Sequence, residues 1–165
     1  FFLRKMKQYI LPVATVIAYS LIPNHFHLLI RTKSETEISE LISSQKKQQN
    51  TSDFIMQQFS NWFNSYAKAY NKMYNRKGTL FMDFVKRNKA ETDDDITSFI
   101  FYIHKNAVHH GLCKQIGEWK YHSYSSVISA KQTSLGRTFH INWFGSNEQF
   151  IKLHLQSVGL KQKDL

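Results

Sequence analysis

Two apolar segments joined by a short turn restrict the fold more than any other feature of the sequence. Residues 13–22 are rich in Val, Ile, Ala and Tyr and lack the three- and four-residue spacing of a helix. Pro23 and Asn24 favour a turn, and residues 25–31 then form an alternating segment that is apolar again at positions 28–30. The pattern predicts an antiparallel hairpin whose first strand is mostly buried.

Other segments of the first half carry the signals of helices. Residues 1–10 have apolar side chains at near-helical spacing and precede Pro12, which predicts the end of a helix. Ser34 and Glu37 match a capping box, which predicts a short helix at that point. Residues 53–75 place aromatic side chains at three- and four-residue steps, the strongest helix signal in the chain.

The second half of the chain has one predicted strand and two predicted helices. Residues 79–89 have the pattern of a strand that ends in a basic cluster. Aspartates at positions 93–95 suit the first turn of a helix, because its dipole favours carboxylates there, and Gly111 ends this helix. An amphipathic segment covers residues 148–158. We therefore expect an α+β fold in a single domain, residues 1–165, without internal repeats.

Composition limits the classes of partner and the compartment. The chain has 22 Lys and Arg against 12 Asp and Glu, a net charge of +10, which favours polyanions but does not distinguish a nucleic-acid-binding protein from a merely basic one. With 42% hydrophobic residues the chain is not intrinsically disordered. One cysteine, Cys113, excludes an intramolecular disulfide, and no apolar run approaches the ~20 residues of a membrane span. We expect a cytoplasmic, nucleoid-associated protein with no membrane partner.

A pair of histidines begins the second strand of the predicted hairpin. Because side chains alternate along a strand, His25 and His27 point to the same face. Such a pair is half of a metal site, although a His-x-His pair on a strand is more often incidental and a site needs further ligands.

The predicted helix over residues 96–110 could supply the rest of a site. Tyr102, Asn106 and His109 share a stripe at the border of its buried face, so a phenol and an amide oxygen point the same way. Two imidazoles and an amide oxygen would hold a divalent cation and leave positions for phosphate oxygens and water. Tyr102 would then act as a nucleophile on phosphorus, a reaction that needs no glycine-rich phosphate loop.

Several stretches resemble a known family. Residues 18–30, which read AYSLIPNHFHLLI, closely resemble the HUH signature of the single-tyrosine transposases. Residues 66–81 are similar to the family's segment between its metal strand and its catalytic helix. Residues 102–112 resemble the catalytic-helix motif of the REP-associated tyrosine transposases, with Ala107 in place of the family's common proline. The similarity continues through residues 119–126 and 144–150 and covers nearly the whole chain from Ala18.

The resemblance implies a fold, a reaction and a set of roles. The fold would be ferredoxin-like, with an antiparallel sheet that bears the histidines and helices packed on it. The reaction would be cleavage and rejoining of single-stranded DNA near hairpins, with Mg²⁺ or Mn²⁺. His25, His27 and Asn106 would be metal ligands, and Tyr102 would form a 5′-phosphotyrosine link. The family also has a first strand that would precede Phe1, and its members are monomers or homodimers.

Basic and imidazole side chains outside this set have predicted roles of their own. Charge and position favour DNA backbone contacts for three residues, Lys86, Arg87 and Lys89. Four further histidines are expected on the surface or against DNA rather than as ligands: His104, His109, His110 and His122.

Two other functions are compatible with the same residues. One is a catalytically inactive protein, derived from such a transposase, that binds hairpin DNA through its basic surface and stacking aromatics. The other is a metal-dependent hydrolase that uses water, for which Glu91 or His109 could be the general base. The presence of all four predicted site residues favours the transposase.

Overall fold

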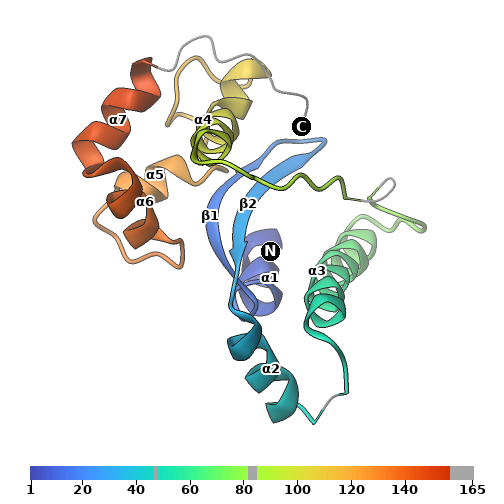
Figure 1. Cartoon of the computed structure of the whole chain (residues 1–165). Helices are drawn as coiled ribbons and strands as arrows, with labels where there is room; N and C mark the ends of the chain where they lie inside the picture. The colour runs from blue at the N-terminus through green and yellow to red at the C-terminus, as the bar shows by residue number, and fades with distance from the viewer. Residues whose placement is uncertain (47, 82–84, 157–165) are drawn as a thin grey trace. The chain divides into compact units, whose positions relative to one another are not determined.

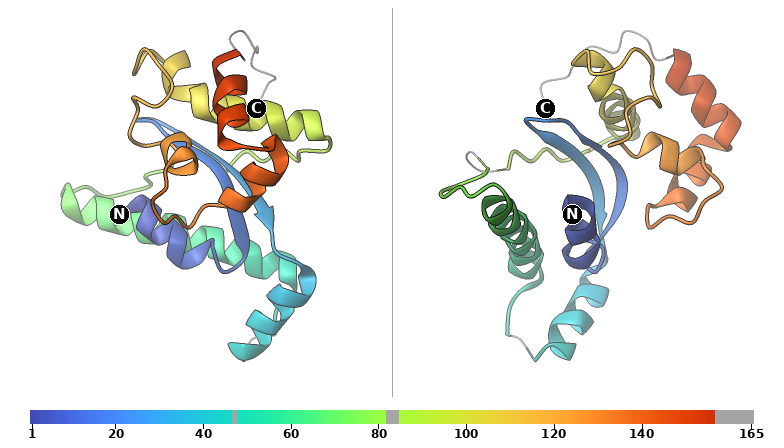
Figure 2. Two further views of the ribbon diagram at one scale, coloured as in Figure 1. Left: turned by 90° about the vertical axis from the view of Figure 1, so that its left-hand side faces the viewer. Right: turned by 180° about the vertical axis from the view of Figure 1, so that it is seen from behind.

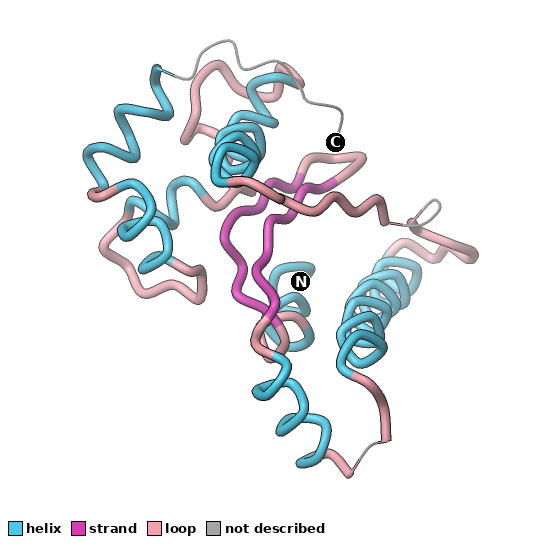
Figure 3. Tube along the Cα trace, in the orientation of Figure 1, coloured by secondary structure: helices cyan, strands magenta, loops and turns pink. Residues whose placement is uncertain are grey.

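The computed structural model describes residues 1–46, 48–81 and 85–156, and within them the fold is α+β (Figures 1 and 3). A two-stranded antiparallel sheet is accompanied by seven helices in these ranges. The elements, in chain order, are α1 (Phe2–Tyr9), β1 (Ala14–Leu21), β2 (Phe26–Thr32), α2 (Glu35–Ser44), α3 (Thr51–Met73), α4 (Asp93–His109), α5 (Tyr124–Ile128), α6 (Arg137–Phe144) and α7 (Asn147–Gln156).

The chain forms two compact units. The first contains Phe1–Thr15 and Arg31–Val85, and the second contains Val16–Ile30 and Lys86–Leu165. The hairpin of β1 and β2 therefore contributes its turn and most of both strands to the second unit. The single domain over residues 1–165 stays a prediction.

The first unit is built on α3. Trp62, in the middle of this helix, is fully buried, and its indole N–H donates to the carbonyl oxygen of Phe2 at 3.1 Å, which attaches α1. A second apolar cluster joins α2 to the first turns of α3 through Ile38, Ile42 and Phe54. The predicted capping box at the start of α2 is confirmed.

The second unit has a core of its own. Seven side chains from the hairpin and from α4 to α7 form it: Ile17, Ile100, Phe101, Tyr124, Val127, Phe144 and Phe150. Figure 2 shows α5, α6 and α7 gathered near α4. Thr92 caps α4: its hydroxyl accepts from the N–H of Asp95 at 3.1 Å, and the Asp95 carboxylate accepts from the N–H of Thr92 at 3.1 Å. Gly111 follows with φ +66°, as the predicted helix end requires.

The strand predicted over residues 79–89 is the main error in the expected elements. Residues 79–81 and 85–89 are not in a strand, and residues 82–84 lie outside the described part of the chain. Instead of pairing with the sheet, Phe81 packs its ring against two side chains of α3, at 5.1 Å from Phe63 and 6.1 Å from Tyr66 between centroids. The apolar residues of this segment favour a strand locally, whereas contact with α3 decides the position of Phe81.

The predicted helices otherwise correspond to observed ones. The expected helix over residues 53–75 is α3, and the one that ends at Gly111 is α4. The segment over residues 148–158 is α7 as far as Gln156, and its last two residues lie outside the described ranges. None of the described helices is both long and apolar enough to cross a membrane.

Candidate active site

Two histidines of the second unit lie side by side where β2 begins. His27 is the second residue of this strand and His25 immediately precedes it, so the two-residue period of a strand sends both rings to one face. Their ring centroids are 5.1 Å apart, with an interplanar angle of 82°. The expectation that His25 and His27 share a face is confirmed.

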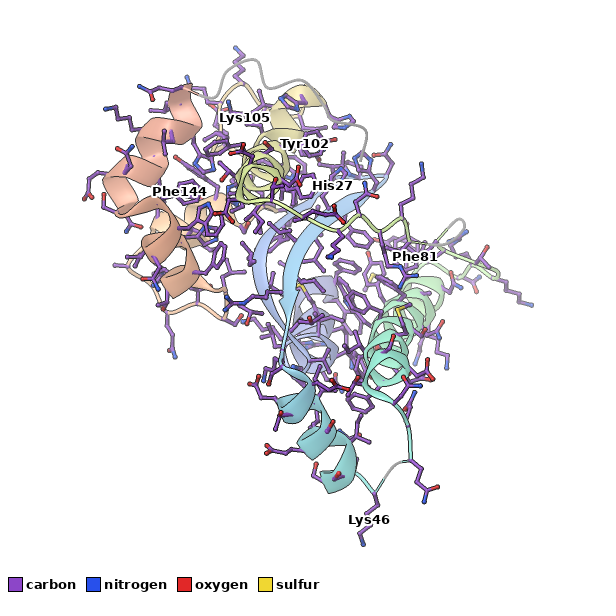
Figure 4. The ribbon with its side chains drawn as sticks, in the orientation of Figure 1. His27, Lys46, Phe81, Tyr102, Lys105 and Phe144 are labelled. Carbon is purple, nitrogen blue, oxygen red and sulfur yellow. The ribbon has the colours of Figure 1, made fainter. Side chains whose placement is uncertain are left out.

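Helix α4 contacts both histidines. The ring of Tyr102 lies edge-on to that of His27, with 5.1 Å between centroids (Figure 4). Two turns later, the ring of His110 lies 4.9 Å from that of His25. The side of α4 that carries Tyr102, continued by His110 just after the last helical residue, therefore lies against the histidine pair. Sequence reasoning placed His110 outside the site, although its spacing of four residues from Asn106 was a signal that could have found it.

Asn106 lies between these two contacts, four residues from each. Its side chain is fully buried, not at the border of the buried face as predicted. Within the described part of the chain, neither its amide oxygen nor its amide nitrogen has a hydrogen-bond partner, and the same is true of the buried Nε2 of His27. Buried amides and imidazoles are normally hydrogen-bonded, so unsatisfied atoms of this kind call for an explanation.

The ring of His25 is oriented by its neighbour in the turn. Its Nδ1 lies 3.0 Å from the side-chain oxygen of Asn24. Because an amide oxygen only accepts, Nδ1 carries the proton and Nε2 keeps a free lone pair. Histidines that bind metals commonly donate their second ring N–H in this way.

Both histidines of the pair are neutral at pH 7. Burial, together with smaller effects of the neighbouring His25 and His110, lowers the pKa of His27 to about 4. The pKa of His25 is also lowered, first by burial and then by His110. Neutral imidazole is the form that coordinates a metal ion, so no proton has to leave before binding.

The donor set fits a divalent ion in part. His25 and His27 offer imidazole nitrogens, and Asn106 offers an amide oxygen without a partner, a mixture that suits Mn²⁺ better than the oxygen-preferring Mg²⁺. Among the residues in the described ranges, no three His, Cys, Asp or Glu side chains are grouped to hold a metal. The candidate metal site therefore needs the amide oxygen of Asn106 as its third protein ligand.

His109 lies beside the phenol of Tyr102. The ring centroid of His109 is 5.8 Å from that of Tyr102, as their common stripe predicted. Tyr102 is half-buried, and His109 is exposed. Burial, followed by the positive charge of Lys105 and by His110, lowers the pKa of His109, so this imidazole is a neutral base at pH 7.

Two other histidines that were expected on the surface are in the core. His104 and His122 are 1% and 3% exposed, so the prediction of surface or DNA-contacting roles is wrong for both. His104 follows Tyr102 by two residues on α4, which places it on the opposite side of the helix, against the core. Burial lowers the pKa of His122 to about 4 and that of His104 well below its ordinary value.

A continuous chain of hydrogen bonds satisfies His104. The Nδ1 of His154 donates to the carbonyl oxygen of Phe150 at 2.8 Å, so its Nε2 accepts from the Nδ1 of His104 at 2.9 Å. The Nε2 of His104 must then accept, and Ser123 donates its hydroxyl proton there at 2.8 Å. The Ser123 oxygen in turn accepts from the N–H of Tyr19 at 2.9 Å. All four ring nitrogens of His104 and His154 are partnered, and both rings are neutral.

The basic cluster Lys86, Arg87 and Lys89 lies on the segment that leads into α4. All three residues are exposed. Exposure suits a contact with a DNA backbone, and that role stays a prediction.

Comparison of the chain with models of protein families, with curated proteins and with solved structures gives no match. The resemblance to single-tyrosine transposases therefore rests on the residues of the motifs.

Proposed function

We propose that the chain is a single-tyrosine transposase of the REP-associated kind, which cleaves and rejoins single-stranded DNA at hairpin sequences. The observation that carries the proposal is the contact between the Tyr102 ring and the ring of His27, whose buried Nε2 has no partner among the described residues. A phenol beside unsatisfied neutral nitrogen ligands is the arrangement that tyrosine-based phosphoryl transfer needs.

Each residue has a separate role in this reaction. His25, His27 and Asn106 would hold Mg²⁺ or Mn²⁺, which when bound neutralises charge on the scissile phosphate. The Tyr102 oxygen attacks phosphorus, the bond to the 3′ oxygen breaks, and the departing strand keeps a 3′ hydroxyl. His109 takes the phenol proton and returns a proton to the leaving oxygen. The 5′-phosphotyrosine keeps the energy of the broken ester, so a 3′ hydroxyl can later displace Tyr102 and rejoin DNA.

The proposal includes the fold. We propose that the hairpin of β1 and β2 is the part of a ferredoxin-like sheet that bears the histidines. Its first strand, β1, is buried, as Val16, Ile17 and Ala18 show, while β2 is half-exposed from Phe26 to Ile30.

A second candidate is a protein that binds hairpin DNA without cutting it. It would need the exposed basic cluster Lys86, Arg87 and Lys89, but neither a metal nor the Tyr102 oxygen. An inactive descendant of a transposase would bind through the same basic surface.

Covalent adduct formation separates these functions. Full-length protein is incubated with labelled single-stranded hairpin DNA from its genomic flanks, with Mn²⁺ or with chelator, and resolved on a denaturing gel. A transposase gives a metal-dependent adduct that disappears in Tyr102→Phe and persists in Tyr121→Phe, an exposed tyrosine of the same unit. Cutting that survives in Tyr102→Phe would indicate a hydrolase, and binding without an adduct would indicate the inactive protein.

A further inference from the structure

Three tyrosines form a ladder along α3 in the first unit. Tyr66, Tyr70 and Tyr74 follow one another at four-residue steps, which places them on one face of the helix end. The ring centroids of Tyr66 and Tyr70 are 6.0 Å apart, and those of Tyr70 and Tyr74 are 4.5 Å apart. This tyrosine ladder is a continuous aromatic surface, ~12 Å long at the rise of a helix.

The ladder leaves the core as it proceeds. Its inner ring, Tyr66, is half-buried and packs edge-on against Phe2 at 4.9 Å. Its outer ring, Tyr74, is 60% exposed. Core packing therefore explains Tyr66 and does not explain the outer end of the ladder, where large aromatic faces meet solvent.

All the charged side chains in the segment that carries the tyrosine ladder are positive. Residues 54–81 contain four cations, Lys68, Lys72, Arg76 and Lys77, and no Asp or Glu. The Arg76 guanidinium lies 5.9 Å from the centre of the Tyr70 ring. Aromatic faces among cations alone are complementary to a strand that offers both bases and phosphates, and they suit single-stranded nucleic acid better than an apolar protein surface.

A groove on the adjoining face of α3 adds a polar group. It has a volume of about 450 Å³, and the residues that line it include Phe63, Phe81 and Lys68. The Asn71 side chain donates to the carbonyl oxygen of Gly78 at 2.8 Å and so fixes one wall. The amide oxygen of Asn71 is buried and has no partner in the described part of the chain, so it can accept from a ring or amino N–H of a base.

We propose that the tyrosine ladder is a stacking platform for unpaired bases of single-stranded DNA. A base stacks on the exposed face of Tyr74, Arg76 and Lys77 contact the neighbouring phosphates, and the groove beside Asn71 receives an adjacent base. The inference rests on the proposed function for its choice of DNA, but it does not depend on the chemistry of Tyr102.

The test compares single-stranded and duplex DNA. Fluorescence anisotropy measures the Kd of the full chain, carrying Tyr102→Phe to prevent cleavage, for a labelled oligothymidine and for a blunt duplex of equal length. In the double variant Tyr70→Ala, Tyr74→Ala we expect the Kd for the single strand to rise at least ~10-fold, because each stacked base contributes measurably to affinity. The Kd for the duplex should change less than about threefold, since the cations remain.

Two control variants separate stacking from other effects. Tyr70→Phe with Tyr74→Phe keeps both rings and should keep the affinity for the single strand. Met73→Ala removes an apolar side chain that is 74% exposed on the same helix and should leave both Kd values unchanged.

Four results would overturn the inference. An unchanged Kd for the single strand in the alanine double variant would do so, as would an equal loss for the duplex. Tighter binding of oligouridine than of oligothymidine would replace DNA by RNA as the occupant. A fall in mass from dimer to monomer in the alanine variant, measured by light scattering, would assign the ladder to a second copy of the chain. None of these results affects the Tyr102 adduct, and a missing adduct leaves the ladder's Kd values as they are.

Discussion

Two pairs of histidines lie on opposite sides of α4, and they differ in how well their nitrogens are satisfied. The rings of His25 and His27 are 5.1 Å apart, and those of His104 and His154 are 5.0 Å apart. Burial is the largest cause of a lowered pKa in all four. Every nitrogen of the His104 pair has a protein partner, whereas the buried Nε2 of His27 has none in the described ranges.

Because both pairs have ring contacts and lowered pKa values, these two features do not identify a functional histidine in this protein. An unpartnered nitrogen identifies one only together with its surroundings. The core rings of His122 and His140 each also have an unpartnered nitrogen within the described ranges, whereas that of His27 lies next to a half-exposed phenol and can bind a ligand.

Loss of His27 should remove activity and leave the fold intact. In His27→Ala we expect adduct formation to fall more than ~100-fold, because even groups that only orient a metal ligand cost 10- to 100-fold. The free energy of unfolding should change by less than about 1 kcal/mol, since the missing Nε2 has no hydrogen bond to lose. Gel assays and urea denaturation check both parts. A large loss of stability with an unchanged amount of adduct would mean that His27 stabilises the fold and does not act in the reaction.

Loss of His104 should lower the stability of the fold. His104→Ala leaves the Nε2 of His154 without its donor, removes one partner of the Ser123 hydroxyl and opens a cavity, which we expect to cost about 3 kcal/mol of unfolding free energy. At this chain length that lowers Tm by roughly 6–12 °C. His109→Ala, on an exposed position of the same helix, is the control for stability and should shift the free energy by less than about 0.5 kcal/mol. Equal melting of the two variants would argue against a structural role for the buried chain.

Acid should destabilise the protein through its buried histidines. Burial lowers the pKa of His154 to about 3 and that of His122 to about 4, so the unfolded state binds more protons than the folded state between these values and about 6.5. Stability is therefore complete above pH 6.5 and falls as the pH is lowered towards 3. Urea midpoints measured from pH 7 to pH 4 should decrease, and the slope should flatten in His154→Leu. A midpoint independent of pH would mean that these rings are not kept neutral by the fold.

Loss of the Ser123 hydroxyl should have a smaller effect of the same kind. Ser123→Ala removes the acceptor of the Tyr19 N–H and the donor to His104, which we expect to cost about 1–2 kcal/mol. Ser125→Ala, an exposed neighbour, is the matched control. Chemical denaturation distinguishes the two, and equal midpoints would show that the chain of hydrogen bonds ends at His104.

The basic cluster should affect DNA binding alone. In Lys86→Ala with Lys89→Ala we expect a weaker, salt-sensitive Kd for single-stranded DNA, with the slope of log K against log salt reduced by about 0.7 per charge. Both histidine pairs, and with them Tm, should be unaffected. Anisotropy titrations at several salt concentrations measure the slope, and an unchanged slope would remove these lysines from the DNA interface.

Much of the fold follows from local patterns. The hairpin, the capping boxes at Ser34 and Thr92 and the long helix α3 depend on alternation, on caps and on helical spacing, which neighbouring residues decide. Residues 79–89 also have a local pattern, but packing of Phe81 against α3 outweighed it.

The sequence by itself determined which side chains share a face: His25 with His27 on a strand, and Tyr102 with Asn106 on a helix, because backbone periodicity fixes these directions. Only the tertiary structure decided what each face meets. It set Tyr102 against His27 and His110 against His25, and it buried His104 against His154, which is 50 residues away in the chain. A histidine on a helix carries no local signal of whether its ring will find solvent, a phenol or another histidine, because that depends on contacts between distant segments.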